Sequence, residues 1–118
     1  MKTSEVLNKA ADLIEERGWA KGDGWPDARR PEDAPLCLEG GILAALGRNH
    51  MGPAIESCPA YAAVWDFLAT DVRWGPYRDR LYDWNDNLGR TASEVIEVLR
   101  AAALIEASRE RETAEVPA

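Results

Sequence analysis

Residues 84–106, WNDNLGRTASEVIEVLRAAALIE, predict the clearest helix of the chain. Thr91 and Glu94 have the spacing of a capping box, in which the Thr hydroxyl accepts a hydrogen bond from the third helical amide and the Glu carboxylate accepts one from the Thr amide. Apolar residues then recur every three or four positions, the period of one helix face: Val95, Val98, Leu99, Ala102 and Ile105. The stretch therefore predicts a capped amphipathic helix with a buried apolar face.

Four further stretches favour helices because their apolar residues recur at the same period: residues 4–17, 35–48, 59–72 and 77–84. Thr3 or Ser4 is the expected cap of the first, and Pro35 suits the opening position of the second. Gly40 and Gly41 weaken that second helix and predict the close approach of a neighbouring helix. No stretch alternates between apolar and polar residues as a half-buried strand does. The expected fold is all-α: a single compact domain of four to five short helices around a Trp-rich core.

The stretch between the first two helices, residues 18–35, is rich in glycine and proline and resists both helix and sheet. Its two tryptophans, Trp19 and Trp25, predict a long loop that is pinned onto the core. Tryptophan is also enriched at binding hot spots. Trp25 and Trp74, which both lie near prolines in expected loops, are therefore the candidate binding residues.

The length of 118 residues matches one ordinary domain, and 46% apolar with 30% charged residues is typical of a globular chain. We expect one helical domain over residues 1–108 and a frayed acidic tail over residues 109–118. No apolar run is long enough to cross a bilayer. The charged first helix argues against a secretory signal peptide, so we expect a cytoplasmic protein with free cysteines.

The net charge of the chain indicates which classes of partner it is expected to bind. Acidic residues number 21 against 14 basic ones, which gives a net charge of −7. This surplus repels phosphate backbones and anionic lipids, so neither direct nucleic-acid binding nor membrane binding is expected. It suits a basic partner, or a mimic of nucleic acid built on acidic residues of the first and last helices: Glu5, Asp12, Glu16, Glu97 and Glu106. Ordinary solubility is the simplest interpretation of the same charges.

Cys37 is the first candidate for chemistry. A position in the opening turn of a helix favours a thiolate, and His50 with Asp86 or Asn85 would complete the set of a cysteine-dependent hydrolase or transferase. Against this, Glu39 opposes the thiolate and the apolar neighbours of Cys37 favour a buried core residue. The core interpretation is the stronger one. The spacing of the two cysteines and the single histidine matches no zinc site.

Residues 83–94 have some features of a calcium loop, with Asp83, Asn85 and Asn87 at its first, third and fifth positions and Glu94 at its twelfth. Leu88 stands where the sharp turn of such a loop needs glycine. A structural turn needs no metal, and its expected residues are Trp84, Asn85, Asp86, Gly89, Thr91 and Glu94. We therefore expect no metal and no cofactor.

Three segments together resemble a family of small helical domains of unknown function from actinobacteria and their phages: AADLIEERGW at 10–19, CLEGGILAAL at 37–46 and WNDNLGRTASEVIEVLRAAA at 84–103. Members of that family begin the second helix with Cys-x-x-Gly-Ala, whereas Gly41 stands here in place of the alanine. The resemblance implies a compact intracellular helical domain and no assigned catalytic residues.

The function expected from all of this is a non-enzymatic protein-interaction module, in the setting of the resemblance a phage accessory protein that acts on a host protein. The alternatives are the Cys37-dependent hydrolase or transferase and the acidic nucleic-acid mimic. The sequence leaves the oligomeric state open.

Overall fold

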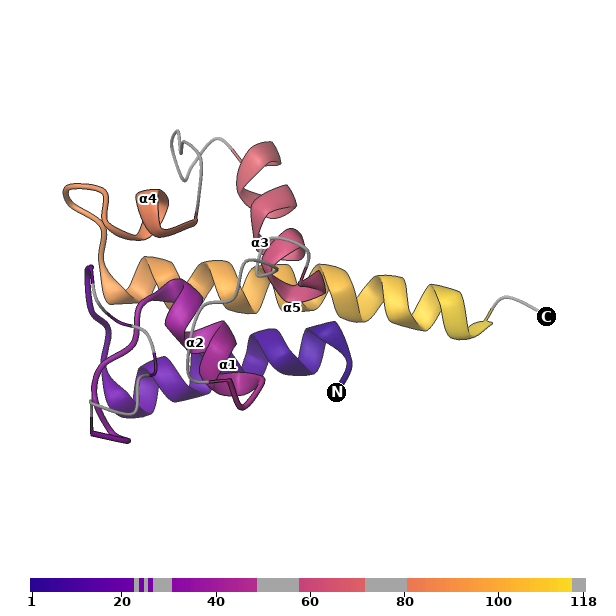
Figure 1. Ribbon diagram of the computed structural model, residues 1–118. Helices are drawn as coiled ribbons and strands as arrows, with labels where there is room; N and C mark the ends of the chain where they lie inside the picture. Colours follow the sequence, from indigo (N-terminus) through magenta and orange to yellow (C-terminus); the bar gives the residue numbers. More distant parts are fainter. Residues whose placement is uncertain (23, 25, 27–30, 49–57, 72–80, 116–118) are drawn as a thin grey trace.

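The computed structural model describes residues 1–22, 24, 26, 31–48, 58–71 and 81–115 (Figure 1). These residues form five α-helices: α1 (Thr3–Arg17), α2 (Leu38–Ala45), α3 (Pro59–Thr70), α4 (Leu81–Asn85) and α5 (Ala92–Glu115). The described part of the chain contains no strand, and its one β-bridge joins Trp19 to Leu36 at the two ends of the loop after α1. The all-α fold expected from the sequence is confirmed.

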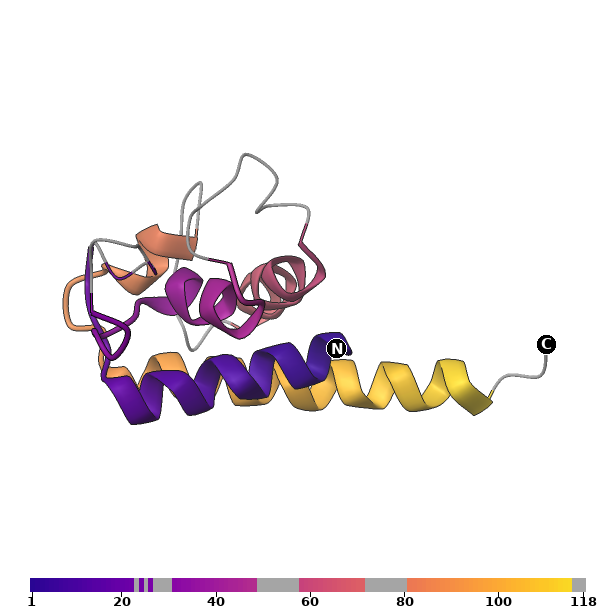
Figure 2. The ribbon, with the colours of Figure 1, turned by 60° about the horizontal axis from the view of Figure 1, so that its bottom comes forward.

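The helices form two layers. α1 and α5 lie side by side, and α2, α3 and α4 cover one side of this pair (Figures 1 and 2). The pair is antiparallel, because Ser4 near the start of α1 bonds to Glu110 near the end of α5. Farther along α1, the Arg100 guanidinium pairs with Asp12 at 2.6 Å and with Glu15 at 3.0 Å. The Ser4–Glu110 hydrogen bonds and the Arg100 ion pairs thus show the register in which the two longest helices pack.

The core lies between the layers and is mainly aliphatic. Its fully buried side chains include Leu7, Ile14, Ile42 and Leu99, together with one indole, that of Trp84. The sequence predicts the close approach of α2 to a neighbouring helix, and this is confirmed at Gly41. A Cβ atom at that position would lie 2.8 Å from Ile14 Cδ1 and 3.3 Å from the Ala10 carbonyl oxygen of α1.

The second helix begins three residues later than its pattern predicts. Leu36 is held in extended backbone, because its amide donates to the Gly18 carbonyl at 3.0 Å and its carbonyl accepts from the Ala20 amide at 3.0 Å. Cys37 then caps α2, with its Sγ accepting a hydrogen bond from the Gly40 amide at 3.3 Å. Pro35 therefore lies in the loop, and the loop is closed at its base by backbone hydrogen bonds.

The last helix is longer than the sequence predicts. α5 continues to Glu115, past residue 108, after which a frayed tail is expected. The Glu110 carboxylate explains the extension, since it accepts hydrogen bonds from the Ser4 amide at 3.0 Å and from the Ser4 hydroxyl at 2.6 Å. The yellow end of α5 projects beyond the start of α1 in Figures 1 and 2. Ser4 thus donates to α5, and neither Ser4 nor Thr3 is the N-cap residue of α1, a place that Lys2 takes.

The contact between Glu110 and Ser4 predicts a pH-dependent stability. The Ser4 hydroxyl and then the Ser4 amide, by donating to the carboxylate, lower the pKa of Glu110 below its ordinary value. A carboxyl whose pKa falls on folding stabilises the fold above its unfolded pKa, about 4.3, and this contribution is lost as the pH falls through the folded pKa. We expect Glu110→Gln to be less stable than the wild type at pH 7, and the difference to shrink below about pH 4.

Urea unfolding at pH 7 and at pH 3.5 tests this expectation. Glu112→Gln is the matched control, because Glu112 is exposed on the same turn of α5 and forms no hydrogen bond or ion pair with α1 within the described residues. A stability difference between Glu110→Gln and wild type that stays constant across this pH range would contradict the assignment.

Candidate functional site

The turn between α4 and α5 is closed by its own hydrogen bonds. The Glu94 amide donates to the Thr91 hydroxyl at 3.3 Å, and the Thr91 amide donates to the Glu94 Oε1 at 3.0 Å, which is the reciprocal geometry of a capping box. Gly89 has a φ of 86°, a backbone conformation that residues with a Cβ rarely adopt. The turn therefore joins α4 to the start of α5 with a defined geometry.

Asn85 is the most connected side chain of this turn and is fully buried. Its Oδ1 accepts hydrogen bonds from the Trp19 indole at 2.7 Å and from the Leu38 amide at 3.0 Å. Its Nδ2 donates to the Ala20 carbonyl at 3.1 Å and to Asp86 Oδ1 at 2.9 Å. One amide side chain thus joins α4, the loop after α1 and the first turn of α2.

This pairing is long-range, whereas Asn and Asp in a turn usually bond to nearby backbone amides. Asp86 Oδ1 accepts from the Gly22 amide at 2.9 Å, so Asp86 also bonds to the loop after α1. The physical reason is that this loop packs against α4 and presents amides that need acceptors. The two residues serve a long-range contact between segments more than 60 positions apart in the chain.

Trp84 lies beside this contact, fully buried in the core. The Arg90 guanidinium covers its ring, with the guanidinium carbon 3.9 Å from the ring centroid, and Arg90 Nε donates to the Trp84 carbonyl at 3.0 Å. Arg90 also pairs with Glu94 Oε2 at 3.3 Å. Arg90, which has no role in a calcium loop, therefore acts as part of the turn.

The calcium interpretation of this turn requires Glu94 to offer both carboxylate oxygens to an ion. Thr91 occupies one of these oxygens and Arg90 occupies the other. Within the described residues, no group of three His, Cys, Asp or Glu side chains is arranged to hold a metal ion. The geometry of the turn supports the structural interpretation.

Cys37 is fully buried at the start of α2. The pKa of its thiol is raised to about 11. Burial is the largest cause, the nearby carboxylates of Glu39 and Asp86 act in the same direction, and the hydrogen bond from Gly40 opposes the change. A thiol with this pKa is protonated at neutral pH. Because the side chain is buried, a dissolved substrate cannot reach it. His50, its expected base, lies outside the described residues, and the Asp86 carboxylate bonds to Gly22 and Asn85.

The raised pKa predicts a thiol that resists alkylation. In native protein at pH 8, we expect iodoacetamide to label Cys37 at least about tenfold more slowly than the partly exposed Cys58, because only the thiolate reacts. Peptide mass spectrometry measures both rates in one sample, and labelling in urea shows that both thiols are intact. Labelling of native Cys37 with an apparent pKa below about 8.5, the ordinary value of a free thiol, would restore the enzyme hypothesis.

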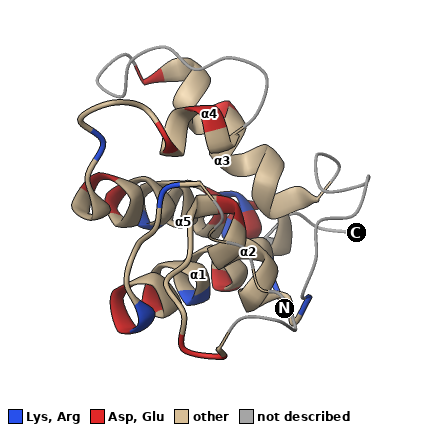
Figure 3. Ribbon diagram, turned by 60° about the vertical axis from the view of Figure 1, so that its left-hand side comes forward, with Lys and Arg blue, Asp and Glu red and all other residues tan. Residues whose placement is uncertain are grey.

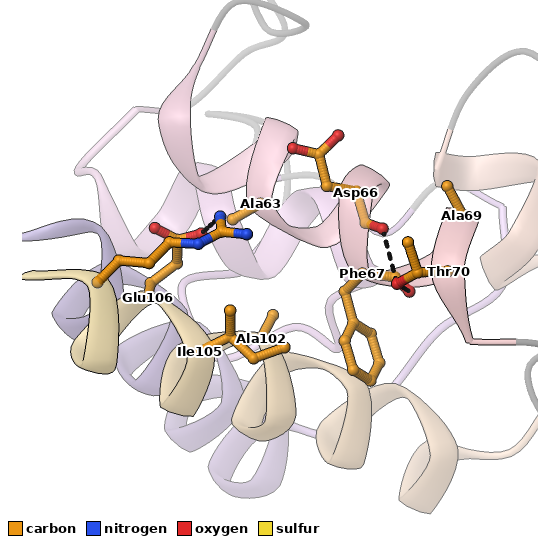
Figure 4. Close-up of a pocket in the computed structure, with 9 residues that line it drawn as sticks. Ala63, Asp66, Phe67, Ala69, Thr70, Ala102, Ile105 and Glu106 are labelled. Atoms are coloured by element: carbon orange, nitrogen blue, oxygen red, sulfur yellow. Dashed lines mark hydrogen bonds and ion pairs between the residues drawn. The ribbon is translucent and has the colours of Figure 1, made fainter.

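A pocket of about 280 Å³ lies between α3 and α5. Figure 4 shows the Phe67 ring reaching from α3 towards α5, and Ala102 and Ile105 facing it from α5. Ala63 and Ala69 of α3 also line the space. Ile105, which the helical pattern assigns to the buried face, is 41% exposed at this pocket. The pattern is wrong for this residue because α3 does not close over it.

The charged residues of this α3–α5 pocket are two acids and one base. Within the described residues, the exposed Asp66 carboxylate has no ion-pair partner. Glu106 pairs with Arg109 at 2.8 Å, and the Arg109 side chain is 61% exposed, against 17% for Glu106. Trp25 and Trp74, the candidate binding residues of the sequence, lie outside the described residues. The α3–α5 pocket is thus a candidate binding site that the sequence analysis does not find.

Comparisons with known proteins place the chain in a family without assigning an activity. Among the described residues, no helix has the length and apolar character needed to cross a membrane. No curated protein and no solved structure matches the chain. The model of one family of unknown function, DUF6197, matches residues 1–104. The chain therefore belongs to this family of unknown function, DUF6197.

Proposed function

We propose that the chain is a non-enzymatic protein-interaction module, and that its α3–α5 pocket receives an apolar side chain of the partner. The observation that carries the proposal is the open space between Phe67 and Ile105, where a half-buried ring and an exposed aliphatic side chain face each other. Interfaces obtain most of their binding energy from a few side chains seated in such pockets. At about 280 Å³ the pocket lies just below the usual range for small-molecule sites, about 300–1,000 Å³.

Two alternatives have less support. The hydrolase or transferase needs a reactive Cys37, whereas burial keeps that thiol protonated. The nucleic-acid mimic needs a row of free carboxylates, but Asp12 pairs with Arg100 and Glu106 pairs with Arg109. Acidic and basic positions both occur along α1 and α5 in Figure 3. A helical protein-binding domain is the function that fits these contacts best.

The family resemblance suggests the setting. Its segments indicate a small protein of an actinobacterium or its phage, and we propose that it acts in the cytoplasm on a host protein. The net charge of −7 argues against direct contact with nucleic acid or anionic lipid, which favours a protein as the partner.

A pull-down from an actinobacterial lysate with paired variants tests the proposed function. Ala69→Trp adds a bulky indole at the exposed edge of the α3–α5 pocket, while Ala114→Trp adds the same indole at an exposed position near the end of α5. We expect the wild type and Ala114→Trp to enrich the same protein and Ala69→Trp to lose it, with thermal unfolding showing that both variants are folded. The absence of any protein whose enrichment depends on Ala69 would count against the module.

A further inference from the structure

We propose that the occupant of the α3–α5 pocket is a basic amphipathic segment of a partner protein. One aliphatic or aromatic side chain of the segment enters between Phe67 and Ile105, and a neighbouring Lys or Arg pairs with Asp66. The inference rests on the proposed function and specifies the chemistry of the partner.

The lining of the pocket favours an apolar side chain as its occupant. Its floor is built from both helices, with Ala102 and Ile105 on α5 facing Phe67 on α3 (Figure 4). Ala102 and Ala63 are buried, so the floor offers carbon atoms and no polar group from these side chains. Burial of an aliphatic or aromatic side chain is the main favourable contribution to such a contact. An apolar side chain matches the chemistry of this lining.

The charged residues at the pocket favour a Lys or Arg next to the apolar residue of the partner segment. Asp66 is exposed on α3, and within the described residues no Lys or Arg pairs with its carboxylate. In Figure 4 that carboxylate points away from the Phe67 ring, which leaves it accessible to a group approaching the outer side of α3. On the α5 side, the pair between Glu106 and Arg109 is made by an arginine that is largely exposed. Exposed pairs of this kind contribute little to stability, so a cation of the partner can replace Arg109 at little cost.

The overall charge favours the same partner over the other occupants. A chain with a net charge of −7 attracts a basic segment before contact and raises its association rate. A second copy of this chain would bring a like charge of −7 to the interface, and an acidic segment would place its carboxylates against Asp66. Of the protein segments that fit an apolar pocket, the basic one gains from both the apolar contact and the charge.

A library of random peptides displayed on phage, selected against the full chain, tests the inference although the partner is unidentified. We expect the enriched peptides to share one large apolar residue beside Lys or Arg, and to be lost with Ala69→Trp but retained with Ala114→Trp. For a synthetic peptide of the enriched sequence, Asp66→Asn is expected to raise Kd about two- to fivefold, the range of an exposed ion pair. Glu112→Gln, which removes an exposed acid that does not line the pocket, is expected to leave Kd unchanged.

The other possible results of these experiments contradict either the basic partner or the interaction module itself. Enriched peptides that need Ala69 but are neutral or acidic, with no effect of Asp66→Asn, would overturn the basic partner and leave the interaction module standing. Basic peptides that bind Ala69→Trp as well as wild type would show attraction to net charge alone and overturn the inference. A dimer in light scattering that Ala69→Trp dissociates would make a second copy the occupant and overturn the basic segment. No peptide that depends on Ala69 would count against both the inference and the module.

Discussion

Replacement of Asn85 by Ala is expected to lower the free energy of unfolding by about 3 kcal/mol. The change removes the acceptor of the Trp19 indole and of the Leu38 amide, and it removes the donor to the Ala20 carbonyl. A buried polar group left without a partner costs about 1–3 kcal/mol, and the sum is reduced where the loop after α1 relaxes and admits water. Urea unfolding followed by circular dichroism measures the loss.

Asn87→Ala is the matched control for Asn85→Ala. Asn87 lies two residues away on the same turn and is exposed, and its backbone groups form the hydrogen bonds of the turn. Its replacement is expected to change stability by less than about 0.5 kcal/mol. Amide hydrogen exchange at Leu38 gives a second readout, because this amide donates to Asn85 Oδ1 and is expected to exchange faster in Asn85→Ala. Equal losses for the two variants would show that Asn85 does not hold the loop.

The sequence predicts the helices that are built from local signals. α1, α3 and α5 carry apolar residues at a period of three to four, and the bounds of α1 and α3 fall within two residues of the expected ones. For α5, the spacing of Thr91 and Glu94 places its start. These features depend on residues within one turn of each other, so a single sequence contains the whole signal.

The contacts that the sequence does not reveal join residues far apart in the chain. Asn85 bonds to Trp19 across 66 positions, and an asparagine in a turn has an ordinary local explanation that hides this contact. The helical pattern starts α2 too early for the same reason, since the bridge between Trp19 and Leu36 keeps Leu36 extended. The polar composition of the tail predicts an end of α5 that is too early. The sequence does not show that Glu110 accepts hydrogen bonds from Ser4 of α1.

The α3–α5 pocket illustrates a further limit. Helical periodicity assigns Ile105 to the apolar face of α5, but it says nothing about whether another element covers that position. The covering helix, α3, ends at Thr70 and presents Ala63 and Ala69 to this region. The sequence does show small residues on both helices. It does not show that these helices face each other, so the pocket can be identified only from the structure.

Replacement of Trp84 by Ala is expected to have the largest effect, a loss of about 3–5 kcal/mol in the free energy of unfolding. Trp84 is the largest fully buried side chain of the described core, and its removal leaves a cavity in the core beneath Arg90. The variant also takes from Arg90 the ring that lies 3.9 Å from its guanidinium carbon. Leu88→Ala is the control on the same turn, because Leu88 is 95% exposed and its loss leaves no cavity.

Trp84→Phe separates the two contributions to this loss. Phenylalanine retains a ring beneath Arg90 but fills less of the space, so its cost is expected to lie between those of Leu88→Ala and Trp84→Ala. Thermal unfolding of the three variants gives this order directly, and Trp84→Phe stays informative if Trp84→Ala fails to fold. A cost for Trp84→Ala below about 1 kcal/mol, far under the usual range for a buried aromatic side chain, would mean that the core closes without the indole. The turn between α4 and α5 would then not depend on Trp84 for its place in the fold.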